Sequence, residues 1–151
     1  MKHMPLKEMM PIFASTKLKL RKYEYMIVSL PIEYKEKVLD LFKYLSAFNS
    51  ITIDTDEVSI ILRSSDWRRL RKEFPIQISE GPYRIITFDI VLDLNLVGFL
   101  SVITALLADA GISVFAISTY LRDHILVKSG DVDGAMSHLN ELIEKCKSTN
   151  L

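Results

Sequence analysis

The stretch LADAGISVFAISTYLRDHILVK, residues 107–128, decides the fold. Apolar residues recur every three or four positions up to Leu107, and the pair Ala110-Gly111 then places glycine where a helix commonly stops. Residues 112–119 (ISVFAIST) predict the most buried strand of the chain, and residues 124–128 (HILVK) predict its partner after a short turn. The stretch therefore predicts the end of a helix followed by a β-hairpin.

Outward from this stretch, the same order of elements occurs twice. Strands are predicted at 25–30, 51–55, 58–63 and 83–92, and helices at 38–45, 67–74, 96–107 and 135–143. Two consecutive β-α-β-β-α patterns predict an α+β protein of two ferredoxin-like βαββαβ units, with antiparallel sheets and helices on one face. We expect the first unit to span residues 23–80 and the second to span residues 81–147.

Residues 1–22 are expected to form an irregular N-terminal extension. Residues 1–23 carry a net charge of +5, while the chain as a whole is neutral. Apolar side chains of the extension could still dock on the body: Met9, Met10, Ile12 and Phe13. All five prolines precede residue 83 and all five glycines follow residue 80, so Gly81-Pro82 marks the expected seam between the units.

Composition excludes several classes of protein. Of the 151 residues, 49% are hydrophobic, which is too many for a disordered chain. With 19 basic and 19 acidic side chains, the protein lacks the positive charge that dominates non-specific nucleic-acid binding. The single cysteine, Cys146, excludes an internal disulfide and fits the cytoplasm. The longest run without charge, residues 94–108, is shorter than a bilayer requires, so we expect no membrane contact.

Three segments resemble the ACT domain family. They are residues 92–98 (LDLNLVG), residues 107–120 and residues 123–127, and a weaker match occurs at residues 55–60 (TDEVSI). The sequence is most similar to small tandem-ACT proteins, to the regulatory ACT domains of aspartate kinases and to CASTOR-type amino-acid sensors. This resemblance implies a non-catalytic regulatory protein without a cofactor, in which an amino acid is held between ACT units. It also implies a homodimer or higher oligomer formed through the sheets and a regulated protein partner.

The expected ligand site combines a helix start with a strand end. Gly98 exposes bare backbone near the start of a helix, where N–H groups favour a carboxylate. Asp93 and Asn95 could receive an ammonium group or simply cap the helix, and backbone from Ile117 to Thr119 could clamp the ligand. Asp123, in the turn matched to the family, is expected to contact the ligand's side chain. The full set of expected site residues is Asp93, Asn95, Leu96, Val97, Gly98, Ile117, Ser118, Thr119 and Asp123.

Two alternatives stay open. The basic segment 63–72 surrounds Trp67 and could bind nucleic acid, although a solvated helix face with Trp67, Leu70 and Phe74 inward is the simpler interpretation. A structural subunit that oligomerises and binds nothing is the second alternative. No metal site is expected, because His124 and His138 lack partners at metal-ligand spacing. We expect no enzyme, since the sequence contains no catalytic triad, phosphate loop or paired carboxylates.

Overall fold

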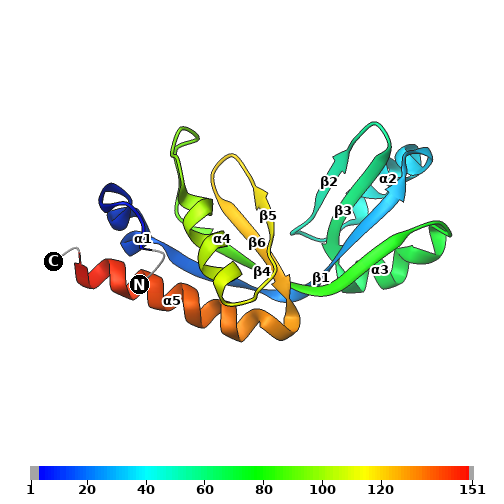
Figure 1. The fold of residues 1–151 in the computed structure, drawn as a ribbon. Helices are drawn as coiled ribbons and strands as arrows, with labels where there is room; N and C mark the ends of the chain where they lie inside the picture. The colour runs from blue at the N-terminus through cyan, green and yellow to red at the C-terminus, as the bar shows by residue number, and fades with distance from the viewer. Residues whose placement is uncertain (1–3, 150–151) are drawn as a thin grey trace. The chain divides into compact units, whose positions relative to one another are not determined.

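The computed structural model describes residues 4–149, and its elements are drawn in Figure 1. The α-helices are α1 (Met10–Ser15), α2 (Lys35–Leu41), α3 (Ser64–Leu70), α4 (Phe99–Asp109) and α5 (Val132–Thr149). The strands are β1 (Lys17–Pro31), β2 (Ser50–Ile53), β3 (Glu57–Arg63), β4 (Ile78–Asp89), β5 (Phe115–Ser118) and β6 (Asp123–Lys128). Strand β3 runs antiparallel to β1 and β2, and β5 runs antiparallel to β6, so the protein is α+β as expected.

The chain forms two compact units. Unit 1 combines the residues up to Arg21 with those from Arg84 onward, and unit 2 consists of Lys22–Tyr83. The strand order is β1-β4-β6-β5 in unit 1 and β2-β3-β1-β4 in unit 2, because β1 and β4 contribute residues to both units. Each unit therefore has four strands in the same pattern, but unit 1 takes its fourth strand from the N-terminal part of the chain.

Unit 2 has its own core between its helices and one face of its strands. Alternate residues of β1 and β3 point into this core, as the period of two in a strand requires. The rings of Trp67 and Phe74 stack there with centroids 6.2 Å apart. Asp66, buried at the start of α3, accepts the backbone N–H of Ser46 at 2.9 Å and thereby ties α3 to the segment after α2.

Unit 1 has a larger core, which includes the N-terminal helix. In Figure 1, α1 lies beside α5, and the two helices are in contact. Phe13 of α1 stacks on Phe99 of α4 with ring centroids 4.7 Å apart, and Phe88 of β4 meets Phe99 edge-on. Met9 and Phe13 are almost fully buried, so the N-terminal segment is part of this core.

The expectation of an irregular extension at residues 1–22 is therefore wrong for its described part. Residues 7–15 are helical, and β1 already begins at Lys17. The sequence 17–21 (KLKLR) alternates charged and apolar residues, which is the pattern of a half-buried strand. The boundaries between the two units lie inside β1 and β4, so Gly81-Pro82 falls within a strand and not in a linker. Residues 1–3 lie outside the described residues.

Two local expectations also need correction. Residues 112–119 were expected to be the most buried strand, but β5 is a four-residue edge strand whose residues are mostly exposed. Its β-branched and aromatic composition reports strand propensity and says little about burial. Helix α4 begins at Phe99, so Leu96 lies in the preceding segment.

Candidate functional site

The segment that leads into α4 is folded by its own polar groups. The Asp93 carboxylate accepts the backbone N–H of Asn95 at 2.8 Å, and the Asp93 carbonyl accepts the N–H of Leu96 at 3.0 Å. Gly98 then adopts φ 96°, a conformation that favours glycine, and α4 begins at the next residue. Asp93 and Asn95 therefore do not cap α4. Within the part of the chain that the structure describes, no side chain caps this helix start.

The β5–β6 turn is held by a second group of hydrogen bonds. Ser118 Oγ donates to Asp123 Oδ1 at 2.6 Å, and the N–H of Thr119 donates to the Arg122 carbonyl at 2.9 Å. The Thr119 hydroxyl donates to the same carbonyl at 3.0 Å. The backbone N–H of Leu92 also donates to the Leu121 carbonyl at 3.2 Å, which ties this turn to the segment before α4.

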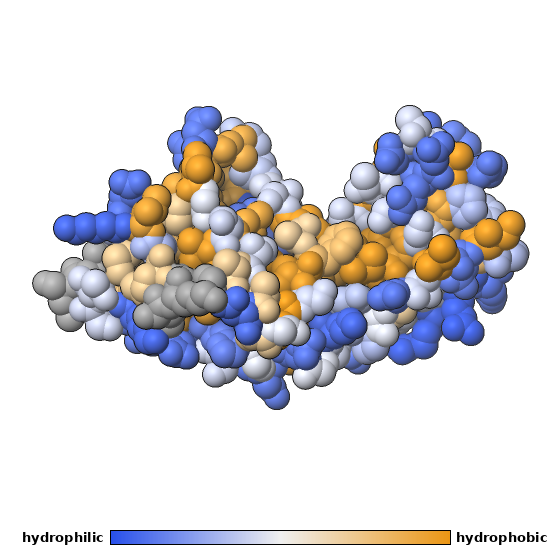
Figure 2. Space-filling model, viewed as in Figure 1, coloured by the Kyte–Doolittle hydropathy of each residue, from blue (hydrophilic) through white to orange (hydrophobic). Residues whose placement is uncertain are grey.

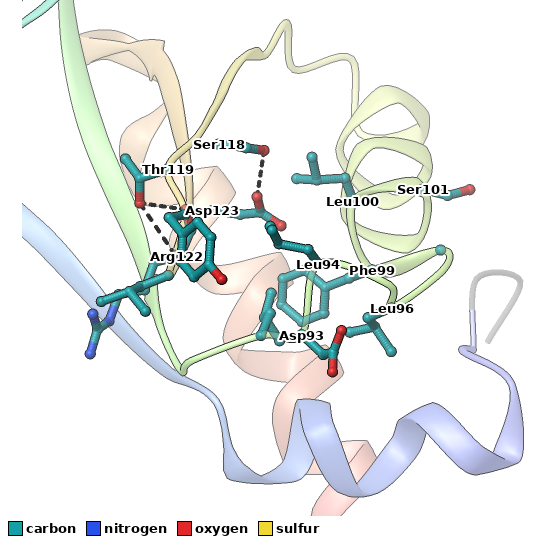
Figure 3. Close-up of a pocket in the computed structure, with 14 residues that line it drawn as sticks. Asp93, Leu94, Leu96, Phe99, Leu100, Ser101, Ser118, Thr119, Arg122 and Asp123 are labelled. Atoms are coloured by element: carbon teal, nitrogen blue, oxygen red, sulfur yellow. Dashed lines mark hydrogen bonds between the residues drawn. The ribbon is translucent and has the colours of Figure 1, made fainter.

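Between these two segments lies a pocket of about 320 Å³, entirely within unit 1 (Figure 3). The Asp123 carboxylate points into the space between Ser118 and Leu94, and the Phe99 ring lies across from it. The volume is at the lower end of the range for ligand pockets, so the pocket suits a small molecule. Its lining residues are Leu92, Asp93, Leu94, Leu96, Gly98, Phe99, Leu100, Ser101, Ser118, Thr119, Tyr120, Leu121, Arg122 and Asp123.

The structure brings six of the nine expected site residues to this pocket: Asp93, Leu96, Gly98, Ser118, Thr119 and Asp123. The other three, Asn95, Val97 and Ile117, lie in the same segments but do not line it. Sequence reasoning missed eight lining residues: Leu92, Leu94, Phe99, Leu100, Ser101, Tyr120, Leu121 and Arg122. The spacing of the turn and of the helix start locates the two segments, but it does not say which side chains face the space between them.

The charges at the pocket are mostly negative. Asp93 and Asp123 both line it, while the guanidinium of Arg122 binds Asp89 at 2.9 Å. The uncapped N–H groups at the start of α4 supply a partial positive charge at the same pocket, since Phe99, Leu100 and Ser101 also line it. The pocket therefore offers complementary positions for a cationic group and for an anionic group.

Exposed apolar side chains surround the pocket. Five of them come from the two segments that form it: Val91 (60% exposed), Leu94 (66%), Val97 (83%), Tyr120 (76%) and Leu121 (47%). Figure 2 shows apolar surface at the upper end of unit 1, over the segment before α4 and the β5–β6 turn. Side chains of this size are rarely left in water in such a cluster without a binding role.

Unit 2 lacks the long segment that builds this pocket. In unit 2, β1 is followed directly by a 3₁₀ turn, Ile32–Tyr34, whereas in unit 1 nine residues separate β4 from α4. A different hollow of about 300 Å³ occurs in unit 2, lined by Ser29, Leu30, Pro31, Asp56, Ile76, Gln77 and Ile78. Most of its surface is apolar, and Asp56 is the one charged residue among the described residues that line it.

The other candidate features carry less chemistry. Trp67, Leu70 and Phe74 are buried, as the simpler interpretation of segment 63–72 predicts, so Trp67 is not available for stacking on a base. Burial raises the pKa of the Cys146 thiol, which disfavours the reactive thiolate. Among residues 4–149, no cluster of His, Cys, Asp and Glu could hold a metal ion, and no helix is both long and apolar enough to cross a bilayer.

Comparison with known proteins identifies the segment that carries the pocket. Residues 78–141 match the family model of the ACT domain. This segment is similar to an ACT domain. The resemblance predicted from the sequence is thereby confirmed, and the pocket-forming residues all lie inside the ACT segment. A comparison with curated proteins finds no significant match.

Solved structures share the fold of most of the chain. A Vibrio cholerae protein of unknown function, described as a possible transport protein, is 20% identical, with a TM-score of 0.70 over 87% of this chain and 92% of that one. The ligand-free regulatory subunit of aspartate kinase from Thermus thermophilus is 8% identical, with a TM-score of 0.64 over 85% of this chain and 97% of that one.

A whole aspartate kinase also shares this fold over part of its length. The aspartate kinase from Clostridium acetobutylicum, described as an allosteric enzyme, is 10% identical, with a TM-score of 0.69 over 85% of this chain and 34% of the enzyme. At such identities the likeness shows the fold alone. The chain therefore shares its fold with the regulatory subunit of an aspartate kinase.

Proposed function

We propose that the protein is a non-catalytic, cytoplasmic regulatory protein that binds an amino acid in the pocket of unit 1. The observation that carries this proposal is the pocket itself, which lies where the two segments expected to bind the ligand meet. We also propose that both units are ferredoxin-like and ACT-type, since each has four strands in the same order. Of the two, unit 1 carries the site.

The ligand's carboxylate would sit at the start of α4. The first N–H groups of a helix have no partner within the helix, and the first residues of α4, Phe99, Leu100 and Ser101, line the pocket. The ammonium group, or a cationic side chain, would face Asp93 or Asp123. Asp123 already accepts the Ser118 hydroxyl through one carboxylate oxygen, so its other oxygen would receive the ligand.

A second copy of the chain would complete the site. The pocket is open and its rim is apolar, so a ligand bound there would remain partly exposed without a covering surface. Strand β5 is at the end of the strand order, where its backbone can pair with a further strand. We therefore propose a homodimer or higher oligomer, whose association the ligand strengthens and a regulated partner detects.

A thermal-shift panel of the twenty standard amino acids tests the proposal. A ligand that binds only the folded protein at a hundred times its Kd adds about 2.7 kcal/mol of stability. For a chain of this size, this raises the Tm by about 5–10 °C. Asp123→Asn should reduce the shift, while Asp133→Asn, the same change at an exposed position on α5, should keep it.

The two alternatives give different results, one in this panel and one in an oligonucleotide binding experiment. If no amino acid raises the Tm of the oligomer at millimolar concentration, the ligand-free structural subunit gains support and amino-acid binding is rejected. If the protein instead binds an oligonucleotide through segment 63–72, with an affinity that falls as the salt concentration rises, the regulatory assignment is replaced by nucleic-acid binding. If the ligand raises the Tm of Asp123→Asn as much as that of Asp133→Asn, the ligand does not bind in this pocket.

A further inference from the structure

A buried histidine stands directly behind the wall of the pocket. His124 is the second residue of β6, and only 4% of its surface is exposed. Ile125 and Val127 belong to the core under the helices, so His124 lies on the opposite face of the strand. There its ring nitrogens meet the hydroxyls of Thr87 on β4 and of Thr119 in the β5–β6 turn.

These polar side chains form a continuous chain of hydrogen bonds in unit 1. Arg21 Nε donates to Thr87 Oγ1 at 3.0 Å, and Thr87 Oγ1 lies 2.8 Å from His124 Nδ1. On the other side of the ring, His124 Nε2 lies 3.5 Å from Thr119 Oγ1, which itself donates to the Arg122 carbonyl at 3.0 Å. The chain therefore runs from β1, through the imidazole, to the turn that lines the pocket.

The arrangement assigns a direction to these bonds. Because the Thr87 hydroxyl accepts from Arg21, its own hydrogen is available for His124 Nδ1. The neutral imidazole then carries its hydrogen on Nε2 and donates toward Thr119. In this direction each hydroxyl both accepts and donates, so every donor in the chain has an acceptor.

We propose that the charge state of His124 controls the position of the β5–β6 turn, so that the wall of the pocket responds to pH. A proton added to Nδ1 makes both ring nitrogens donors. Thr87 Oγ1 would then face two donors, the imidazolium and the guanidinium of Arg21, and could no longer donate to the ring. The imidazolium and Arg21 would also repel one another, so the ring must shift, and the bond to Thr119 must shift with it.

The charges around His124 favour its neutral form. Burial lowers the pKa of His124 most, and Arg21 on β1 lowers it further. Asp123 at the start of β6 opposes this decrease, while Arg122 in the turn adds to it. Asp89 on β4 binds Arg122 and partly offsets that charge. The switch would therefore operate below the ordinary range of histidine, and the turn is held in its present form at neutral pH.

The consequence for the pocket follows from the bonds of Thr119. Its N–H and its hydroxyl both donate to the Arg122 carbonyl, and its hydroxyl accepts the N–H of Arg122 at 3.3 Å. A displacement of the Thr119 side chain therefore alters the turn that includes Tyr120 and Leu121. The claim that pH regulates ligand binding rests on the proposed function. The claim that the β5–β6 turn moves when His124 is protonated does not.

The test uses the full chain without any ligand. The pH switch can therefore be refuted while amino-acid binding is confirmed, and amino-acid binding can be refuted while the switch is confirmed. The histidine ring resonances and the backbone amides are followed by NMR from about pH 8 to about pH 4.5. Exposed His138 on α5 serves as a reference in the same spectra. We expect the amides of Thr119, Leu121 and Arg122 to shift along the titration curve of His124, with a Nε2–H ring at high pH.

Matched variants separate the switch from a general acid effect. Thr87→Val removes the hydroxyl that joins Arg21 to the ring, and the amides of the turn should then stop following His124. Thr104→Val removes a hydroxyl that donates to carbonyls of its own helix, those of Leu100 at 2.8 Å and Ser101 at 3.3 Å, and should leave the coupling intact. If Thr87→Val does not fold, the wild-type titration decides. The proposal is overturned if His124 titrates while the amides of the turn stay still, or if the neutral ring carries its hydrogen on Nδ1.

Discussion

Replacing Phe13 with alanine should destabilise the whole of unit 1, because the N-terminal helix is part of its core. Phe13 is 1% exposed, and its ring stacks on Phe99 with centroids 4.7 Å apart. Truncation of a buried phenylalanine to alanine costs about 3–5 kcal/mol. A domain is stable by only about 5–15 kcal/mol, so this single change removes a large fraction of the total.

The assay is thermal and urea unfolding of the full chain. At about 2–4 °C per kcal/mol for a chain of this size, Phe13→Ala should lower the Tm by about 6–20 °C. Leu6→Ala is the control, since Leu6 belongs to the same segment but is 68% exposed, and its loss should cost under about 0.5 kcal/mol. If the two variants unfold at the same temperature, the N-terminal segment does not pack as described.

Three further predictions concern single residues. Gly98→Ala should lower the free energy of unfolding by about 1–2 kcal/mol, because a residue with a side chain is strained at φ 96°. Gly130→Ala is the control and should leave this free energy unchanged, because its new Cβ would meet open space. Asp66→Ala should cost about 1–3 kcal/mol at neutral pH by leaving the Ser46 N–H without its acceptor. His124→Gln should reduce the loss of stability that wild type shows on acidification, measured by urea unfolding at a series of pH values.

The signs of the two pH effects follow from the direction of each pKa shift. Although burial acts to raise it, the Ser46 N–H and Arg69 together lower the pKa of Asp66 below its ordinary value. Its contribution is therefore present above about pH 4 and lost as the pH falls further, so the gap between wild type and Asp66→Ala should close there. The pKa of His124 is also lowered, so stability falls as the pH drops below about 6.5, by at most about 1.4 kcal/mol per pH unit.

The parts of the fold that depend on local spacing could be predicted from the sequence. Gly111 has φ 73° just after α4, as its position after an apolar repeat predicts, because only the backbone of the helix end decides it. The hairpin of β5 and β6 and the segment before α4 were also found in this way. These local signals were sufficient to place the two segments that form the pocket.

The parts that depend on distant contacts could not be predicted in the same way. The strand at 17–21 has a readable alternation, but nothing in it says that it joins a unit formed by residues beyond 84. Leu94, Tyr120 and Arg122 line the pocket because two separate segments meet, and propensity does not describe such a meeting. The bond between Thr87 and His124 joins positions 37 residues apart, so no motif contains it.

The central claim is that an amino acid binds in the pocket of unit 1, and amide chemical-shift mapping tests it most directly. The twenty standard amino acids are added to the isotopically labelled full chain, first as a mixture and then singly. The account predicts that one or a few of them move the amides of residues 92–101 and 118–123, with Phe99 and Leu100 among them. It is contradicted if those amides stay unchanged at millimolar concentration, or if the shifts occur only in unit 2.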